Sequence, residues 1–417
     1  MISSARSAEQ VRIAIIGGGI GGLTLAQGLR KYGIESRVFE RAEARTDYVQ
    51  GFRLAIRDRG LSALAECLPE RLYDAVLETA GKAPEQVLRL DEHLEPIGQG
   101  NDPWRNRSDA HRQLSLSRIT LRQVLLEGLQ DIVSYGAVFS HYHHNADGSL
   151  TAHFDDGGSV TCEVLIGADG ANSRVRKQLL PHATSHDTGA RRLAGKISLD
   201  AAARCGILPL FGQHGVSIKP ANGHQLMVTS HRVDPGAYQK YGLIGWDDAT
   251  HRGIEGFHFD NTTSYIWWNT AHWRGELAAD DVLLSCAPSR LLELLIASFG
   301  GYHPEILKLI RHTDPSTVAA LRVRSSDPPP PWPTRNVTLL GDAIHAMTYF
   351  CALGGNSAMV DAGELTRQLV AVKAGKKPLL EGIRGYETAM RAHGFEAVRN
   401  SLMSMQAALG PRSVETA

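Results

Sequence analysis

The chain has 417 residues, 43% of them apolar and 21% charged, with 44 Lys and Arg side chains against 44 Asp and Glu. This length allows two or three domains of about 150 residues each. Because the formal net charge is zero, the chain lacks the basic excess typical of nucleic-acid or anionic-membrane binding, and we expect neither partner. Five widely spaced cysteines predict free thiols in a reducing compartment, so we expect a cytoplasmic protein.

The first forty residues predict a β-α-β unit. Val11 to Ile16 is a short β-branched run of the kind that forms a strand buried on both faces, and a glycine-rich turn follows it. Apolar residues then recur at helical spacing as far as Gly33, and Ser36 to Glu40 predicts a second strand. Glycines interrupt the apolar run from Val11 to Leu25, so we expect no signal peptide and no membrane-spanning helix.

The rest of the chain alternates strand and helix patterns. Hairpin signals between residues 135 and 166 predict a β meander, and the strand-like runs 225–229 and 265–269 predict a second, mainly antiparallel domain. Residues 327–333 are rich in proline and predict a stiff crossover. After it we expect a buried strand at 337–340, a helix at 355–372 and an amphipathic helix near the C-terminus that is interrupted by Gly394.

Gly17, Gly19 and Gly22 form a G-x-G-x-x-G pattern between the first strand and its helix. The first glycine permits a tight turn, the second lets the backbone approach a pyrophosphate, and the third lets the helix pack closely on the sheet. Glu40 closes the second strand, where an acidic side chain can bind ribose hydroxyls. The pattern therefore predicts a dinucleotide site.

Two further motifs extend this prediction. Residues 167–176 (Gly-Ala-Asp-Gly-Ala-Asn-Ser-Arg-Val-Arg) end a strand, and residues 341–345 (Gly-Asp-Ala-Ile-His) precede the run from Leu353 to Ala362. With the N-terminal glycines, the chain resembles the single-component (group A) FAD-dependent monooxygenases of the para-hydroxybenzoate hydroxylase type. The resemblance implies an α/β fold: a Rossmann-like, glutathione-reductase-type FAD-binding βαβ domain, a mainly antiparallel β-sheet substrate domain and a C-terminal helical segment. We expect the FAD-binding domain at 1–183 and 326–375, the substrate domain at 184–325 and the helical segment at 376–417.

The resemblance also implies roles for individual residues. The ADP half of FAD would be bound by the glycines and by Glu40, and Arg118 would contact the cofactor. Arg176 would be the basic partner in the Asp169 motif and an aid to NAD(P)H docking. Asp342 would bind a ribitol hydroxyl, and the start of the following helix would lie at the pyrimidine edge of the isoalloxazine ring. The complete set of expected cofactor-binding residues is Gly17, Gly19, Gly22, Glu40, Arg41, Arg118, Asp169, Gly170, Asp342, Gly354, Gly355 and Asn356.

One loop departs from the family pattern. Tyr349 stands where the family usually has a proline, and Ala352 stands where it has a glycine. Both changes alter the stiffness of the loop and its approach to the flavin ring. We expect Tyr349 and Arg53 beside the flavin as candidate catalytic residues, and a structural hydrogen bond rather than catalysis for His345.

A mostly apolar substrate pocket is expected between the flavin domain and the antiparallel sheet. Alternation along a strand means that either Tyr265 and Trp267 or Ile266 and Trp268 face the flavin. His231 and Tyr349 are further candidates for the lining, and ordinary core packing is the alternative for each residue. The expected substrate residues are Leu226, Val228, Trp267, Asn269, Met347 and Phe350.

The histidines at 141, 143, 144 and 153 invite comparison with a metal site, since residues i and i+2 of a strand share a face. Without a cysteine or a Glu-x-x-His partner, exposed hairpin histidines are the preferred interpretation, and we expect no metal.

The resemblance implies an enzyme that uses FAD, NAD(P)H and O2 to hydroxylate or epoxidise a small hydrophobic, aromatic or polycyclic molecule through a C4a-(hydro)peroxyflavin. A single nucleotide fingerprint is present, so NAD(P)H would act as a transient reductant without a Rossmann domain of its own. The alternatives are a Baeyer-Villiger oxygenase on the same scaffold, a flavin oxidase or dehydrogenase, and a flavin-binding protein without catalysis. We expect a monomer or a homodimer.

Overall fold

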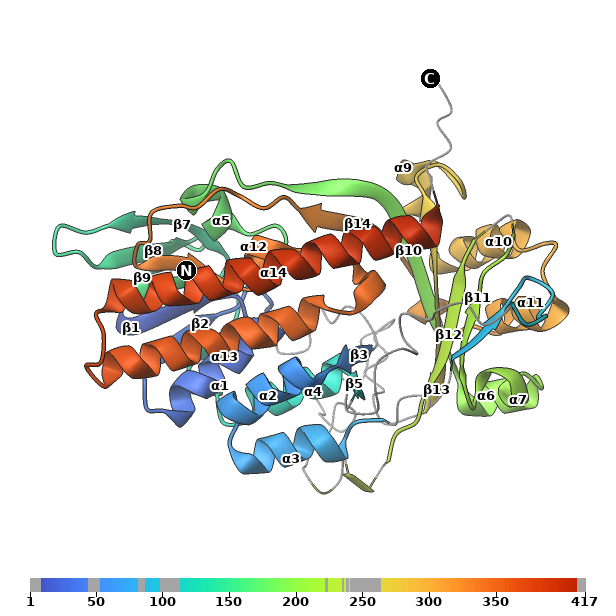
Figure 1. The fold of residues 1–417 in the computed structure, drawn as a ribbon, viewed down its shortest axis with the longest axis horizontal. Helices are drawn as coiled ribbons and strands as arrows, with labels where there is room; N and C mark the ends of the chain where they lie inside the picture. The colour runs from blue at the N-terminus through green and yellow to red at the C-terminus, as the bar shows by residue number, and fades with distance from the viewer. Residues whose placement is uncertain are drawn as a thin grey trace, which may run out of the picture. The chain divides into compact units, whose positions relative to one another are not determined.

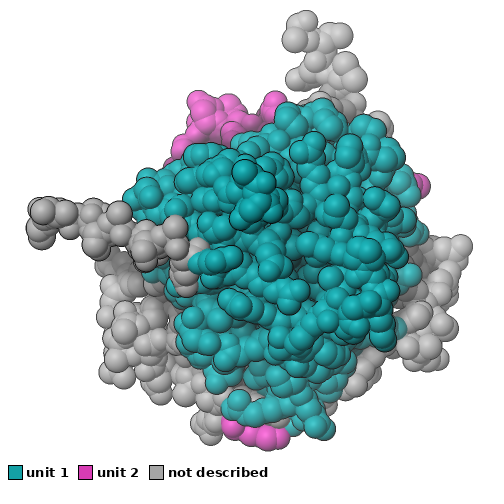
Figure 2. Space-filling view, turned by 90° about the vertical axis from the view of Figure 1, so that its left-hand side faces the viewer, with its two compact units in different colours: residues 1–78, 120–186, 324–402 teal, residues 79–119, 187–323, 403–417 magenta. Residues whose placement is uncertain are grey.

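The computed structural model describes residues 9–43, 53–81, 87–97, 113–221, 224–234, 236–237, 240 and 264–410. The chain divides into two compact units, coloured teal and magenta in Figure 2. Unit 1 comprises residues 1–78, 120–186 and 324–402, and unit 2 comprises residues 79–119, 187–323 and 403–417. Gly51 and Phe52 lie outside the described residues. The domain boundaries expected from the sequence stay a prediction.

Unit 1 contains a mostly parallel sheet in the strand order β6-β2-β1-β9-β8-β7, with β15 also paired to β9 (Figure 1). The hairpin of β7 and β8 is antiparallel and pairs with the first half of β9, whereas β15 runs parallel to its second half. The strands are β1 Glu9–Ile16, β2 Ser36–Phe39, β6 Val133–Ser134, β7 Phe139–His144, β8 Leu150–Phe154, β9 Ser159–Gly167 and β15 Val337–Leu339, and a further short strand is β3 Arg53–Ile56.

The predicted N-terminal β-α-β unit and the β meander are confirmed. β1 has a parallel neighbour on each side, which explains why its residues from Ile13 to Ile16 are apolar on both faces and almost fully buried. In the helix after it, α1 (Ile20–Lys31), every residue from Ile20 to Leu29 is buried. This helix is therefore part of the core and carries its first polar surface only in its last turn.

Helices in unit 1 pack closely at glycines. A Cβ added to Gly28 of α1 would lie 2.5 Å from Oγ1 of Thr366 in α13, and one added to Gly382 of α14 would lie 2.7 Å from Cγ2 of Val372 in α13. Figure 1 shows α13 (orange) and α14 (red) side by side. The two long helices are α13 Gly354–Lys373 and α14 Leu379–Leu409. The other helices after α1 are α2 Asp58–Cys67, α3 Glu70–Glu78, α4 Arg118–Leu126, α5 Arg174–Leu179, α12 Asp342–His345 and the 3-10 turn Tyr349–Cys351.

Unit 2 contains a second sheet in the order β14-β10-β13-β12-β11-β4. β10 pairs with β13, β13 with β12 and β12 with β11, and these three pairings are antiparallel as predicted. β4 pairs with β11 in parallel. The strands are β4 Val87–Leu90, β5 Leu114–Ser117, β10 Ser185–Ser198, β11 Gly215–Ile218, β12 Leu226–His231, β13 Tyr265–Trp273 and β14 Ala319–Ser326. The helices are α6 Leu199–Arg204, α7 Leu208–Phe211, α9 Asp280–Leu283, α10 Pro288–Ser298, α11 Pro304–Arg311 and the 3-10 turn Pro315–Thr317.

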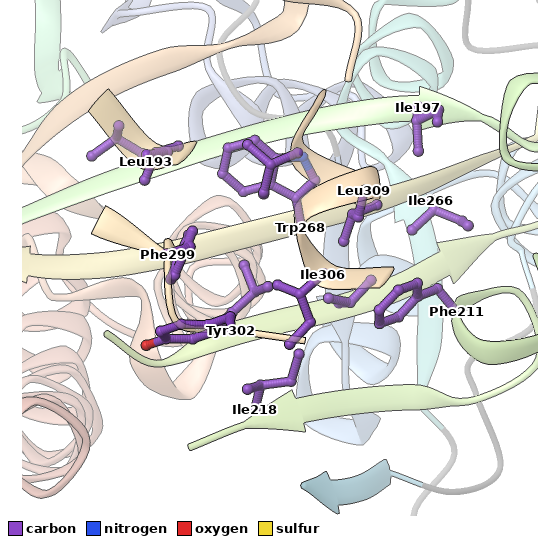
Figure 3. Close-up of a cluster of buried hydrophobic side chains, with 14 of the residues drawn as sticks. Leu193, Ile197, Phe211, Ile218, Ile266, Trp268, Phe299, Tyr302, Ile306 and Leu309 are labelled. Carbon is purple, nitrogen blue, oxygen red and sulfur yellow. The ribbon is translucent and has the colours of Figure 1, made fainter. Parts of the chain in front are cut away.

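One face of this second sheet forms a hydrophobic core with the helices that follow it. Trp268 and Ile266 of β13 lie in this core with Phe299 and Leu309 (Figure 3). Leu226 and Val228 belong to the same core and are completely buried. Val228 pairs with Trp268 and lies on the same face of the sheet, so Leu226 and Val228 pack in the core and do not line the substrate pocket expected from the sequence.

Arg191 of β10 is an unusual buried cation in unit 2. Its guanidinium donates to Asp187 Oδ1 at 2.8 Å and to Asp280 Oδ1 at 2.7 Å, and its side chain is completely buried. Burial opposes ionisation of Asp187, but the Arg191 guanidinium beside it holds the pKa of this carboxyl well below its usual range. The pair therefore fixes the start of β10 to α9.

Removing the charge of Arg191 takes away the buried cation that Asp187 and Asp280 share and leaves them the half-exposed Arg274. We expect Arg191→Met to lower the free energy of unfolding by about 3 kcal/mol, measured by urea denaturation at neutral pH. Arg290→Met is the matched control, because Arg290 pairs with Glu293 on the surface, with side chains 56% and 61% exposed. Equal losses in the two variants would contradict the structural role of Arg191.

Candidate functional site

Three parallel strands of unit 1 end at the same edge of the sheet. Ile16 of β1 and Leu339 of β15 both pair with Gly167 at the end of β9. The turns that follow these strands are therefore neighbours, although about 150 to 170 residues separate them along the chain. They carry the three motifs identified in the sequence.

The glycine turn after β1 is set by close approach of the backbone. Gly17 has φ +112°, and a Cβ on it would lie 2.3 Å from the carbonyl oxygen of Ala168. A Cβ on Gly22 would lie 2.1 Å from the carbonyl oxygen of Gly17, whereas one on Gly19 would meet no atom within 4 Å. Gly17 and Gly22 therefore close the turn, and Gly19 leaves open space at the start of α1.

Glu40 folds back onto this turn. Its Oε2 accepts a hydrogen bond from the Gly18 amide at 2.6 Å, and its Oε1 accepts one from the Ala42 amide at 2.9 Å. Arg122 of α4, which the sequence analysis did not identify, donates through Nε to the Gly18 carbonyl at 3.3 Å. Arg41 follows on the exposed surface. The carboxylate thus lies beside the glycine turn, at the position where a ribose would be bound.

Asp169, in the turn after β9, supplies an acceptor atom that has no donor in the described structure. Its Oδ2 accepts from the backbone amide of Arg174 at 2.7 Å, while Oδ1 is buried without a partner. Burial raises the pKa of this carboxyl, and the hydrogen bonds from Ser173 and the α5 backbone oppose that rise. Next to it Gly170, at φ +75°, has open space where a side chain would be. A ligand hydroxyl or water would satisfy Oδ1.

Arg176 connects two of the turns. It is 4% exposed, and its guanidinium donates to the carbonyls of Ala343 at 2.8 Å and Ala171 at 3.0 Å. These bonds tie the turn after β15 to the turn after β9. A side chain buried and bonded in this way is not available to a visiting nucleotide, which corrects the idea that Arg176 aids NAD(P)H docking.

Asp342 lies beside the start of α13. It is exposed, and its Oδ1 lies 3.8 Å from the Cβ position of Gly354, which Met347 also approaches at 3.7 Å. The first residues of α13, Gly354 and Gly355, have no side-chain cap and no acidic residue in the first turn. The amides at this helix end are therefore unpaired by side chains and favour a negative charge.

Asn356 has a different role from a direct ligand side chain. Its Oδ1 accepts from the Arg57 amide at 2.8 Å, and its Nδ2 donates to the carbonyls of Ala55 and Ala352 at 2.8 and 2.9 Å. All of these partners are backbone groups. Asn356 thus fastens β3 and the preceding loop to the first turn of α13, and only its backbone amide remains for a cofactor.

The loop that departs from the family pattern keeps a glycine-like backbone. Ala352 has φ +51° and ψ +33°, the left-handed conformation that glycine adopts more readily than any other residue. Tyr349 opens the short 3-10 turn, and its ring stacks on that of Phe350 at 4.5 Å between centroids. Ala352 therefore holds a conformation that a glycine at this position would adopt more readily.

A buried ion pair supports the Asp342 turn from behind. Asp361 Oδ2 lies 2.7 Å from His345 Nε2 and accepts from the Gly341 amide at 2.8 Å, and His393 Nε2 lies 2.9 Å from Asp361 Oδ1. A Cβ on Gly394 would lie 2.5 Å from the His345 ring, which explains the glycine in the C-terminal helix. The structure thus gives His345 the contact with a carboxylate that holds this turn in place.

The other expected residues are placed individually. Arg53 begins β3, and Arg118 begins α4 on the surface, within the residues of unit 2. Trp267 and Asn269 share the face of β13 opposite the hydrophobic core, with Thr229 and Met227 of β12 as their partners.

The residues present fit FAD. α1 and α13 both begin without a side-chain cap or an acidic residue, which suits the pyrophosphate and a flavin ring that becomes anionic on reduction. Open space at Gly19 and Gly170 and the unpaired Asp169 Oδ1 lie between them along the sheet edge. The donor set is that of a dinucleotide site.

Comparisons with known proteins agree with this geometry. The FAD binding domain family matches residues 10–204 and 317–401, well over half of the chain. A putative FAD-containing monooxygenase from Photorhabdus luminescens is 30% identical and superposes with a TM-score of 0.81. The superposition covers 97% of this chain and 100% of that chain. The chain belongs to the FAD-dependent monooxygenase family.

More distant relatives extend the comparison. The dual O-methyltransferase/FAD-dependent monooxygenase CTB3 from Cercospora beticola is 28% identical over 99% of this chain, which spans only 48% of that protein. 3-Amino-4-hydroxybenzoate 2-monooxygenase PtmB3 from Streptomyces platensis is 29% identical, with 91% of this chain and 84% of that protein aligned. Klebsiella pneumoniae HpxO, solved with FAD and uric acid, shares the fold at 21% identity and a TM-score of 0.73, with 96% of this chain and 89% of that chain covered. None of the described helices combines the length and apolar composition needed to cross a membrane.

Two glycine substitutions separate folding from binding. We expect Gly22→Ala to lower the free energy of unfolding of the apoprotein by about 1–3 kcal/mol, because its Cβ would overlap backbone. Gly19→Ala should leave unfolding unchanged and weaken FAD binding, because its Cβ enters the open space at α1. Urea unfolding and FAD titration measure the two effects, with Gly301→Ala as a control in open space. Unchanged FAD affinity in Gly19→Ala would contradict the proposed site.

The His345–Asp361 pair predicts a dependence of stability on pH. Burial alone would lower the pKa of His345, but Asp361 opposes this and the pKa is raised above 6.5. A raised folded-state pKa stabilises the folded protein fully below the unfolded value, and the stabilisation is lost as pH rises through the folded value. The difference in unfolding free energy between wild type and Asp361→Asn should therefore shrink as the pH rises above about 6.5. A difference that stays constant over this range would show that His345 is neutral.

Proposed function

We propose that this chain is a monooxygenase that uses FAD, NAD(P)H and O2 to transfer one oxygen atom to a small hydrophobic, aromatic or polycyclic molecule. The observation that carries the proposal is the exposed Asp342 carboxylate beside the uncapped start of α13, within a segment that the family matches. A protein that merely bound a nucleotide would need the glycine turn at α1 but not this second site.

The chain's own residues would bind and orient the cofactor. Gly17, Gly19 and Glu40 would hold the adenosine end, and Asp342 would accept a hydrogen bond from a ribitol hydroxyl. The amides of Gly354 and Gly355 would lie at the pyrimidine edge of the ring and stabilise negative charge there. Bound FAD supplies the hydride acceptance and the oxygen activation that no side chain provides.

The substrate would meet the face of β13 that carries Trp267 and Asn269. The guanidinium of Arg192 lies 5.3 Å from the Trp267 ring, and the Lys196 ammonium lies 5.2 Å from the Tyr265 ring, so this face combines aromatic surface with positive charge. Such a face suits an aromatic ring bearing hydroxyl or carboxylate groups. The PtmB3 relative, named for 3-amino-4-hydroxybenzoate, is compatible with this class.

Hydroxylation is the reaction favoured over a flavin oxidase. The Tyr349 and Ala352 substitutions in the active-site loop are the feature of the sequence that favours an oxidase. Ala352 keeps the left-handed conformation, so the substitution alone gives no reason for the loop to leave the ring. The Baeyer-Villiger alternative would use the same cofactor-binding residues and would transfer the oxygen atom to a ketone.

The remaining expectations complete the proposal. NAD(P)H would act as a transient reductant, and the protein would be a monomer or a homodimer.

Burial raises the pKa of Cys67 to about 11 and that of Cys162 to about 12, which leaves both thiols protonated and unreactive. All five cysteines are free, in keeping with a reducing, cytoplasmic environment.

The proposal is tested with the FAD-loaded protein, NAD(P)H and dioxygen enriched in a heavy isotope, across a panel of hydroxylated aromatic compounds. We expect at least one compound both to accelerate NAD(P)H oxidation and to gain one labelled oxygen atom. Hydrogen peroxide in full yield for every accelerating compound would contradict the monooxygenase and support an oxidase. Trp267→Ala should lower labelled product per NAD(P)H at unchanged FAD content, and Trp332→Phe, in unit 1, is its control.

A further inference from the structure

Unit 2 holds a cluster of possible metal ligands that the proposed oxygenation chemistry does not use. It consists of His224, just before β12, His272 near the end of β13, and Glu276 in the turn after β13. One ligand atom from each lies within 4.8 Å of those of the other two. His272 and Glu276 are close to each other in the sequence, near the end of β13, but His224 is far from both, so spacing along the chain does not reveal the cluster.

His272 has one ring nitrogen without a hydrogen-bond partner in the described structure. The side chain is completely buried, its Nε2 lies 3.1 Å from Thr270 Oγ1, and its Nδ1 has no hydrogen-bond partner in the described structure. When Nε2 carries the proton and donates to the threonine, Nδ1 keeps a lone pair. Metal-binding histidines are oriented in the same way, by a hydrogen bond from the nitrogen that does not bind the metal. A cation would satisfy an atom that the protein leaves unpaired.

The other two ligands are close and partly exposed. His224 Nδ1 lies 3.6 Å from Glu276 Oε2, and their side chains are 19% and 32% exposed. Glu276 Oε2 also accepts a hydrogen bond from the Trp273 amide at 2.6 Å. Ligand atoms of a tetrahedral zinc ion lie roughly 3.4 Å apart, given zinc–nitrogen bonds of about 2.0–2.1 Å. The His224 and His272 rings are already adjacent, at 4.0 Å between centroids, so rotation of the His224 ring toward the held carboxylate would complete the geometry.

The surroundings keep the cluster in place. The Tyr302 hydroxyl accepts from the backbone amide of His224 at 2.9 Å and donates to its carbonyl at 3.0 Å, and Tyr302 belongs to the core shown in Figure 3. Arg191 pairs in register with His272, and its guanidinium is bonded to Asp187 and Asp280, which also pair with Arg274. Burial lowers the pKa of both histidines.

We propose that His224, His272 and Glu276 form a binding site for a divalent transition metal of the zinc class, with the fourth position open to solvent. Two imidazoles and one carboxylate favour zinc over magnesium or calcium, which take mainly oxygen ligands. The ion would tie the turn after β13 to the chain before β12. Its role would be to stabilise unit 2, because binding to the folded state alone raises stability.

The test is titration of the FAD-loaded protein with Zn²⁺ alone, by calorimetry, together with the thermal midpoint of unfolding. We expect one zinc ion per chain, a rise of the midpoint with zinc, and at least about a tenfold loss of affinity in Glu276→Gln, which removes an exposed ligand without disturbing the core. His224→Gln should behave in the same way. Replacement of Zn²⁺ by Co²⁺ should give the visible bands of nitrogen and oxygen ligands without a thiolate charge-transfer band.

The hairpin histidines supply the matched control. His143 Nδ1 and His153 Nε2 lie 2.9 Å apart on the exposed β7–β8 hairpin and offer the simplest competing site for a metal ion. His143→Gln should keep the zinc affinity and the rise in midpoint. Loss of binding in His143→Gln, full binding in Glu276→Gln, a cobalt–thiolate band, or no zinc binding by the wild type would each overturn the proposal.

Discussion

The site depends on one constraint, the parallel register that brings β1, β9 and β15 to an end at the same edge of the sheet. The glycine turn after β1 packs against the carbonyl of Ala168, and a side chain at Gly17 would overlap it. Arg176 then bonds the turn after β9 to the turn after β15 through the carbonyl of Ala343. Segments from opposite ends of the chain are thereby held at distances that only backbone groups and glycines allow.

Two helix ends give this edge its chemistry. α1 and α13 both begin without a capping side chain, so their first amides are available to negative charge. Asp342 lies beside the second helix end and is held there from behind, because Asp361 bonds the Gly341 amide while pairing with His345. This arrangement suits a ligand that donates a hydrogen bond from a hydroxyl group to the carboxylate and places a negatively charged edge at the helix end.

Much of this arrangement could be predicted from the sequence. Elements with a strong period, such as β1, α1 and α13, lie where the pattern of apolar residues predicts them. The motifs after the parallel strands also come together, because their glycines are required by contacts that vary little within a fold. Strand alternation correctly separated Trp267 from Trp268, which lie on opposite faces of β13.

Other features depend on contacts between distant residues and have no local pattern. The register of β12 with β13 places Leu226 and Val228 on the core face of the sheet, and the sequence alone does not show this register. β4 joins the second sheet from residues that carry no strong strand pattern. The bonds from Arg122 to Gly18 and from Arg176 to Ala343 join positions more than 100 residues apart, so spacing along the chain cannot reveal them.

A crystal structure of the FAD complex tests the central claim most directly. The account predicts the pyrophosphate at the first amides of α1 near Gly19, a ribitol hydroxyl at Asp342, and the pyrimidine edge of the ring at the amides of Gly354 and Gly355. It also predicts that Asp169 Oδ1 gains a hydrogen-bond donor from the cofactor or an ordered water. A flavin ring bound away from the start of α13, with Asp342 making no contact to the cofactor, would contradict the account.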